Sequence, residues 1–436
     1  MSRGEGYRRP RALSPLREHL RDTFWFAPTA AMVLTFGLWV GAYEADAAIM
    51  RMLQDDENYA EVTELIRLVD EAKTVITTVS SAMMTFIGVV FSISLVAVQM
   101  ASGQFTPRVV RIFVRSRITK LTFAVFLAAF TLSLLVLTSF DSETDPRLVT
   151  TVPFLQSGLT LLMVTLSLFL FIAYVSSTLR LMRVGHVVDR ITWEALRVVD
   201  KMPRGDVGGL SFGPETGRIG YSGHGGVLRD VNIARLVRAA RRHGVVLRLI
   251  PRIGDFVVPG TPLLAVHGGA KAPSRASLRY TVSVGVERTF HQDLGFGLRQ
   301  LSDIALRALS PAVNDPTTAV QCLDRIVQLL TALADRPLGA VAHRDGRDEV
   351  RLVQDVPDWA DLVDLSFAEI RLYAVGSPQV TRRIVAGLND LLQLAPEARR
   401  EPLLRHRELL AQAVALAVPE AAERTFALEP DRQGIG

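Results

Sequence analysis

Four long apolar segments constrain the fold of this chain more than any other feature of its sequence. Each is nearly free of charge and about 20 residues long: Phe24–Tyr43, Thr77–Met100, Leu121–Phe140 and Phe154–Val175. At about 1.5 Å per residue, a helix of this length reaches roughly 30 Å, which is the thickness of the hydrocarbon layer of a bilayer. The sequence therefore predicts four transmembrane helices.

The composition agrees with a membrane protein that also carries a soluble part. Of the 436 residues, 49% are hydrophobic and 21% are charged, and the charged residues lie mostly outside the four apolar segments. The formal net charge of +5 is spread among acidic residues, so nucleic acid is not an expected partner. Cys322 is the only cysteine, which excludes an intramolecular disulfide and a cysteine-based zinc cluster.

The charges of the connecting segments predict the orientation of the spans, because positive residues resist translocation. The N-terminal segment 1–23 and the connection between the second and third spans are rich in arginine. The segments 44–76 and 141–152 carry most of the acidic residues near the spans. We therefore expect a multi-pass protein of a bacterial inner membrane, with both termini in the cytoplasm and the acidic segments outside.

The second span carries small and polar residues at steps of three, four or seven, which places them on one helical face. They are Thr78, Ser81, Thr85, Gly88, Ser92 and Gln99. Such a polar stripe can let helices approach closely and form hydrogen bonds. It can also line a wet path if several subunits surround an axis. One four-helix subunit is too small for a pore, so the second alternative requires a homo-oligomer.

Two further features bear on the membrane part. The span interiors contain no Asp, Glu, Lys, Arg or His, which argues against ion-coupled transport. The segment "FTPRVVRIFVRSR" after the second span predicts an interfacial helix with Arg108, Arg111 and Arg115 on one side. These arginines either contact anionic lipid headgroups or only fix the topology.

The remaining residues predict an α+β cytoplasmic domain. We expect transmembrane helices over 24–178, a helical extension over 179–204, a β-rich module over 205–286, a mainly helical part over 287–418 and a tail over 419–436. The stretch "GDFVVPGTPLLAV" is similar to the strand-turn-strand of small barrel-sandwich modules. Biotinyl and lipoyl carriers present a lysine at that turn, and this stretch has none, so we expect a structural module without a cofactor.

A dense polar turn, "RALSPAVNDPTTA", interrupts the helical part. Ser310-Pro311 should end a helix predicted over Val286–Leu309. Asp315 should then cap the next helix, with Pro316 at its first position. The turn is therefore a structural corner or a site for an ion or a small ligand. Its candidate residues are Asp303, Arg307, Ser310, Asn314, Asp315 and Thr317.

No residue pattern in the chain predicts catalysis. The eight histidines are scattered, and neither a sequence-local metal site nor a Ser-His-Asp pattern can be found. We therefore do not expect an enzyme.

Three segments of the chain resemble one known family. They are "VVFSISLVAVQMASGQFTPRVVR", "GDFVVPGTPL" and "QDLGFGLRQLSDIALRALSPAVNDPTTA". Together they resemble the bacterial predicted membrane proteins catalogued as domain of unknown function 2254, over about Phe24 to Val418. Gly226-Val227 and Asn232 stand where that family often has a Gly-Tyr pair and an Asp. The resemblance implies the architecture above.

Three functions remain from the sequence, and the third, a membrane-tethered enzyme, has no catalytic pattern to support it. The first is a homo-oligomeric channel-like protein or passive pore with a cytoplasmic regulatory domain, based on the polar stripe and the acidic outer segments. The second is a membrane sensor or scaffold whose cytoplasmic domain binds a ligand or a protein. The expected partners are the lipid bilayer, further copies of the chain, and ions or a small cytoplasmic ligand.

Overall fold

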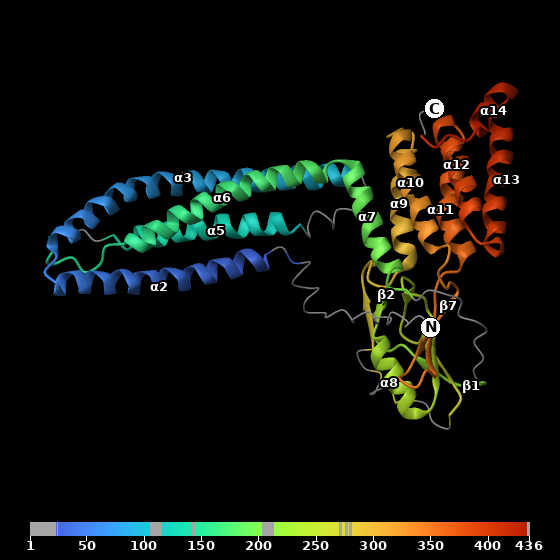
Figure 1. Cartoon of the computed structure of the whole chain (residues 1–436), viewed down its shortest axis with the longest axis horizontal. Helices are drawn as coiled ribbons and strands as arrows, with labels where there is room; N and C mark the ends of the chain where they lie inside the picture. The colour runs from blue at the N-terminus through green and yellow to red at the C-terminus, as the bar shows by residue number, and fades with distance from the viewer. Residues whose placement is uncertain are drawn as a thin grey trace, which may run out of the picture. The chain divides into compact units, whose positions relative to one another are not determined.

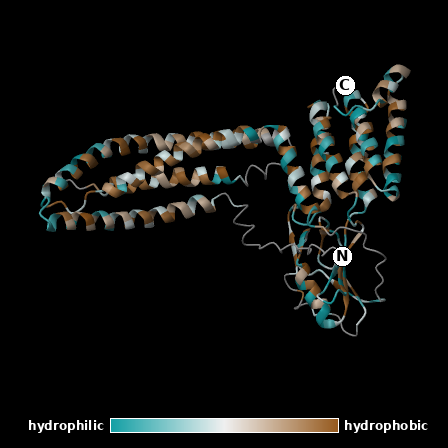
Figure 2. Ribbon diagram, viewed as in Figure 1, coloured by the Kyte–Doolittle hydropathy of each residue, from teal (hydrophilic) through white to brown (hydrophobic). Residues whose placement is uncertain are grey.

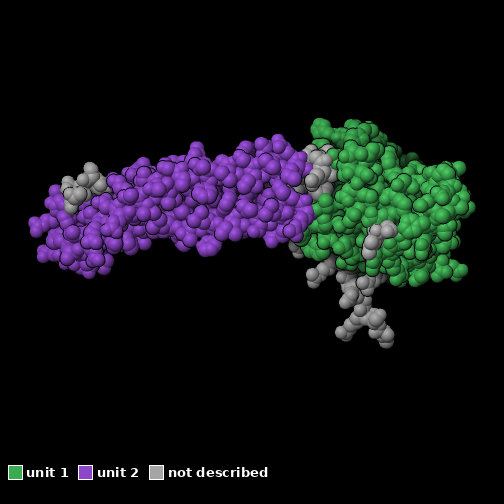
Figure 3. All heavy atoms as spheres, turned by 90° about the horizontal axis from the view of Figure 1, so that it is seen from above, with its two compact units in different colours: residues 1–14, 184–436 green, residues 15–183 purple. Residues whose placement is uncertain are grey.

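The computed structural model describes residues 23, 25–104, 116–140, 145–202, 213–269, 273–274, 278 and 281–433. The chain forms two compact units, which are residues 15–183 and residues 184–436 together with 1–14 (Figure 3).

The first unit contains the four apolar helices that the sequence predicts. They are α2 (Phe26–Asp55), α3 (Tyr59–Gln104), α5 (Arg117–Leu137) and α6 (Phe154–Leu181). Among the described residues, these are the helices long and apolar enough to cross a membrane. Hydrophobic residues cover most of their length (Figure 2), and the helices run alongside one another (Figure 1).

Helix α5 is the most buried of the four. It packs against α2, α3 and α6. Half of the residues in its most apolar 18-residue stretch are buried, compared with about a fifth in the corresponding stretch of each other helix. Phe126 and Ala129 of α5 meet Met83 of α3 and Val164 of α6 in one cluster. Helices α2, α3 and α6 therefore keep large apolar surfaces facing away from the unit, as expected for helices in contact with lipid.

Helix α3 is one continuous helix of 46 residues. At about 1.5 Å per residue it is roughly 69 Å long, more than twice the hydrocarbon thickness. The acidic residues after Asn58 therefore lie in the same helix as the span and do not form a separate short helix. One seam of residues, each seven positions after the last, packs toward the unit: Val62, Val69, Ile76, Met83, Val90 and Ala97. A repeat of seven keeps one helical face against its neighbours along the whole length.

The α2–α3 connection and the described part of the α5–α6 connection pack together at one end of the unit (Figure 1). Met50 of α2, Val62 and Val69 of α3, and Val149 and Val152 of the α5–α6 connection share a buried cluster. Because α2 continues to Asp55 and α3 begins at Tyr59, most of the acidic segment 44–76 is helical.

The second unit begins with helix α7 (Val184–Val199). The helical extension predicted over 179–204 is therefore interrupted, since α6 ends at Leu181 and a short turn separates it from α7. Helix α7 buries Val187, Ile191 and Val198, among others, and packs against α9 and α10. It is thus a core element of the second unit.

Two sheets form the β part of the second unit. The strands are β1 (Glu215–Gly220), β2 (Gly226–Val231), β3 (Val246–Leu249), β4 (Phe256–Val257), β5 (Pro262–His267), β6 (Val282–Gly285), β7 (Ala340–Arg344) and β8 (Val350–Asp355). One sheet has the order β1-β5-β3-β8-β7, and the other has the order β4-β2-β6. Helix α8 (Ile233–His243) packs on the first sheet, and residues of both sheets and of α8 share one apolar cluster.

This topology changes two expectations and leaves one open. β4 and β5 belong to different sheets, so "GDFVVPGTPL" is not a simple hairpin. β8 pairs in parallel with β3, so the β region is not confined to 205–286. Asp345-Gly346 lies in the turn between β7 and β8, which pair antiparallel as a hairpin. A β-rich region is thus confirmed, whereas its barrel-sandwich form stays a prediction.

The rest of the second unit is helical, as predicted. The elements are α9 (Leu294–Ala308), α10 (Pro316–Leu333), α11 (Trp359–Ala374), α12 (Pro378–Leu394), the short η1 (Glu397–Arg399), α13 (Arg400–Ala417) and α14 (Ala421–Leu428). Helix α9 starts eight residues later than the predicted Val286. Asn232 caps α8 by accepting a hydrogen bond from the backbone N–H of Arg235 at 3.0 Å, a role that Asp fills equally well.

Candidate functional site

The polar stripe of α3 lies on the outer side of the first unit. Thr78, Ser81, Thr85, Gly88, Ser92 and Gln99 are all exposed in the single chain. At about 100° per residue, these positions fall on the side of the helix opposite to the buried seam. No neighbouring atom lies within 4 Å of the position that a Cβ would occupy at Gly88. The stripe therefore does not serve packing within one subunit.

Serines of α3 outside the stripe form polar contacts with the neighbouring helices. Ser133 of α5 donates a hydrogen bond to the Ser80 hydroxyl of α3 at 3.0 Å. The hydroxyls of Ser94 and Tyr174 lie 2.6 Å apart and join α3 to α6. Ser80 and Ser94 thus contribute to packing within the helical bundle. The stripe residues are not used in this packing and can contact a surface outside the subunit.

The hydroxyls of the stripe residues Thr78 and Ser81, near the middle of α3, are satisfied locally. Thr78 Oγ1 donates to the Thr74 carbonyl at 2.9 Å, and Ser81 Oγ donates to the Thr77 carbonyl at 3.1 Å. A hydroxyl bonded in this way still offers lone pairs to water or to a neighbouring helix.

The predicted interfacial arginines Arg108, Arg111 and Arg115 lie outside the described residues.

The corner between α9 and α10 is held by local bonds. Asp315 caps α10: its carboxylate accepts the Thr318 backbone N–H at 3.0 Å and the Thr318 hydroxyl at 2.6 Å. Ser310 Oγ donates to the Arg307 carbonyl at 2.7 Å. Asn314 has a positive φ of 47°, a conformation that Asn tolerates better than most residues.

The other corner candidates do not converge with this cap. Asp303 pairs with Arg299 at 3.0 Å within α9, and Thr317 is exposed in the first turn of α10. The contacts of Asp315 and Ser310 account for a helix-corner-helix without a bound group. A ligand at this corner stays a prediction.

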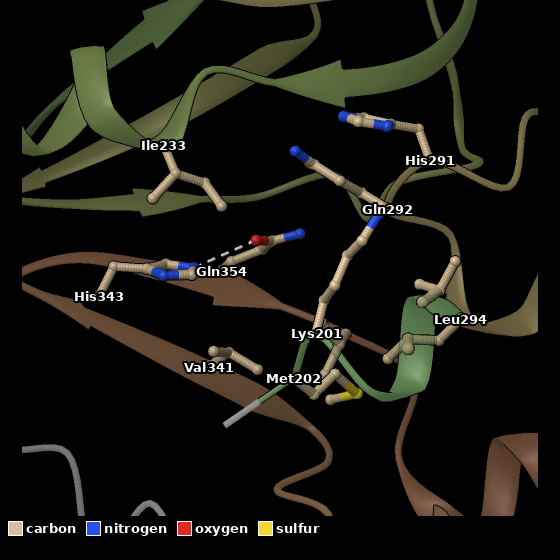
Figure 4. A pocket seen from close by; sticks show the side chains of 11 residues that line it. Lys201, Met202, Ile233, His291, Gln292, Leu294, Val341, His343 and Gln354 are labelled. Carbon is tan, nitrogen blue, oxygen red and sulfur yellow. Dashed lines mark hydrogen bonds between the residues drawn. The ribbon is translucent and has the colours of Figure 1, made fainter. Parts of the chain in front are cut away.

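A pocket lies elsewhere in the second unit, where its β and helical parts meet (Figure 4). The cavity has a volume of about 50 Å³. The end of α7, the segment before α9 and the β7–β8 hairpin supply most of its wall. Its lining residues are Val198, Lys201, Met202, Ile233, His291, Gln292, Leu294, Val341, His343, Gln354 and Val356.

Hydrogen bonds fix the polar residues of this wall. The Gln292 side chain forms two hydrogen bonds with the backbone of β2. It accepts from Val231 N–H at 3.2 Å and donates to Val231 C=O at 3.0 Å. His343 Nε2 lies 3.3 Å from Gln354 Oε1 across the β7–β8 hairpin. His291 Nε2 lies 3.6 Å from Asp230 Oδ1, and Asp230 is buried and does not line the pocket.

The motif "QDLGFG" lies where the β part and the helical part of the second unit meet. Asp293 forms a two-pronged ion pair with Arg288, at 2.7 and 2.8 Å. Burial raises the pKa of the Asp293 carboxyl above its ordinary value, and the Arg288 guanidinium opposes that shift. A Cβ at Gly254, whose φ is +102°, would lie 2.7 Å from Asp293 Oδ2. A Cβ at Gly297 would lie 2.4 Å from Ala195 Cβ of α7. The two glycines thus let the turn before β4 and helix α7 approach this segment closely.

Sequence reasoning missed the pocket because its residues come from distant parts of the chain. Lys201, His291 and His343 are separated by 90 and 52 residues, so no local spacing relates them. The only local signal was the glycine-rich "QDLGFG" before α9. Among the described residues, no group of three or more His, Cys, Asp and Glu is placed to hold a metal ion.

Comparisons with known proteins agree with this architecture. The family described as "Predicted membrane protein (DUF2254)" matches residues 21–390. Uncharacterized proteins of Mycobacterium bovis and Mycobacterium tuberculosis are each 28% identical over 435 residues, covering 95% of this chain and 79% of the relative. No solved structure matches the chain. The chain belongs to the DUF2254 family of predicted membrane proteins.

Proposed function

We propose that this protein assembles as a homo-oligomer and forms a passive pore, with the polar stripe of α3 facing the axis. The carrying observation is that the stripe points away from the subunit's own helices, while Ser80 and Ser94 supply the contacts inside the bundle. A polar face directed at hydrocarbon is less favourable than one directed at water or at a neighbouring copy.

The proposal includes an orientation. Arginines before α2 and between α3 and α5 favour a cytoplasmic position for both segments and therefore for residues 184–436. The acidic first turns of α3, with Glu61 and Glu64 exposed, would then lie at the outer mouth and concentrate cations there. We infer a bacterial inner-membrane location from the same charge pattern.

Ion flux through liposomes that contain the purified protein tests the pore. Thr85→Leu combined with Ser92→Leu should reduce flux to the level of protein-free liposomes, because leucines replace two polar groups that line the path. Phe91→Leu is the matched control: Phe91 is exposed on α3 but lies about 100° around the helix from Ser92. A wild-type protein that conducts no ion under voltage or osmotic load would exclude a pore.

A second candidate function rests on the pocket. A cavity with fixed polar groups and an apolar wall is the usual form of a small-molecule site. Its wall includes the last turn of α7, which follows the fourth apolar helix after a short turn. A ligand in this pocket would contact the end of α7, and the other end of α7 is connected in sequence to the fourth apolar helix, as a sensor requires. Binding of any small molecule that is lost on mutation of the pocket tests this candidate.

A further inference from the structure

We propose that the pocket binds the carboxylate of a small monocarboxylic acid with a short aliphatic chain. The inference rests on the second candidate function and does not depend on the pore. It follows from three properties of the pocket: its charge, the chemistry of its wall and its size.

The charge of the lining favours an anion. Lys201 supplies an ammonium group, and none of the eleven lining residues is Asp or Glu. His291 and His343 add imidazole rings, whose Nε2 atoms face Asp230 and Gln354, and Gln354 adds an amide. Figure 4 shows Lys201, His291 and His343 around the same hollow, each from a different segment of the chain. The Lys201 ammonium group can donate charge-assisted hydrogen bonds to a carboxylate.

The remaining wall is aliphatic. Six of the lining residues carry only hydrocarbon or thioether side chains: Val198, Met202, Ile233, Leu294, Val341 and Val356. A fully polar anion such as inorganic phosphate would leave most of its oxygens against these side chains without hydrogen bonds, which is unfavourable. A carboxylate on a short alkyl chain matches both parts of the wall.

The volume limits the length of that chain. A cavity needs roughly 10–15 Å³ for each water-sized occupant. A volume of about 50 Å³ therefore holds about three to five non-hydrogen atoms. Acetate and propionate fit this limit, and hexanoate exceeds it. We therefore expect an optimum at two or three carbons.

Saturation-transfer NMR on the full-length protein in lipid nanodiscs tests the assignment, with empty nanodiscs as the blank. The probes are acetate, propionate, butyrate, hexanoate, n-propylamine and inorganic phosphate. We expect saturation of acetate and propionate, less of butyrate, and none of n-propylamine. Because phosphate has no carbon-bound protons, its binding is measured by its displacement of propionate.

Variants assign the signal to the pocket. Lys201→Met should weaken propionate binding roughly tenfold or more, because a charged donor is lost. Lys201→Arg should restore part of that binding. Val341→Leu should shift the preference from propionate toward acetate. Arg242→Met, on the exposed face of α8, is the matched control and should leave binding unchanged.

The possible failures are distinguishable. Binding of n-propylamine, or of phosphate as tightly as propionate, would overturn the carboxylate assignment and leave a ligand-binding role in place. Propionate binding that Lys201→Met leaves unchanged would overturn the site. If none of the probes binds, the carboxylate assignment is wrong, and the liposome flux still reports separately on the pore.

Discussion

At the scale of single residues, buried polar groups of the second unit are matched to specific partners. His406 of α13 is 2% exposed, and its Nε2 lies 2.7 Å from Asp364 Oδ1 of α11. Burial lowers the pKa of His406 below its ordinary value, and the contact with Asp364 opposes that shift without cancelling it. Arg371 and Arg405 also disfavour a charge on the ring. The folded protein therefore holds His406 in its neutral form to lower pH than the unfolded chain does.

This arrangement predicts a pH dependence of stability. Below about pH 6.5 the unfolded chain binds a proton at His406 more readily than the folded protein does, so the free energy of unfolding falls with falling pH. His406→Gln keeps a side-chain donor toward Asp364 and removes the titration. The fall in Tm between about pH 7 and about pH 5.5 should be smaller in this variant than in the wild type. The control is His224→Gln at an exposed position, which should retain the wild-type fall. An unchanged pH dependence in His406→Gln would contradict the assignment.

At the scale of helices and strands, the parts that local signals specify could be predicted, and the parts that depend on distant partners could not. Asp315 and Pro316 identified the start of α10 because a cap and its helix are adjacent in sequence. The pairing of β3 with β8 joins residues more than 100 positions apart, such as Leu247 and Leu352. No local sequence pattern could therefore predict it. The continuity of α3 was missed because its charge changes along the helix while its seven-residue seam does not.

Asp46 is the clearest long-range cap in the first unit. It lies in α2, is 2% exposed, and accepts hydrogen bonds from the backbone N–H groups of Leu155 and Gln156 at 2.8 and 3.3 Å. These are the first N–H groups of α6, which have no partner within that helix. Gln156 Nε2 donates to the same carboxylate at 3.1 Å. An acidic residue of one helix thus fixes the start of another.

Removal of this cap should destabilise the first unit. Asp46→Ala leaves the Leu155 and Gln156 donors buried without their acceptor, which should lower the free energy of unfolding by about 1–3 kcal/mol. Asp46→Asn keeps one carbonyl acceptor and should show a smaller loss. Asp55→Ala, at the exposed end of α2, should have little effect. Unfolding in mixed detergent micelles measures the difference, and equal stability of Asp46→Ala and Asp55→Ala would refute the capping role.

At the scale of the whole molecule, the proposed pore depends on where the stripe of α3 points in the membrane. Sequence reasoning identified the stripe but left open whether it packs within the subunit. The structure decides that point, because the buried seam of α3 lies on the opposite side. What faces the stripe is a property of the assembled protein, and the pore requires that it be another copy.

Cysteine cross-linking in native membranes measures this most directly. Cys322→Ala provides a cysteine-free background. The Cys322 thiol is buried and burial raises its pKa, so this thiol should not react even in the wild type. Ser92→Cys on the stripe should form disulfide-linked dimers on mild oxidation, or dimers bridged by a short bismaleimide. Phe169→Cys, exposed on α6, should remain monomeric under the same conditions. If Ser92→Cys cross-links no faster than Phe169→Cys, the stripe does not face a second copy, and the proposed pore is contradicted.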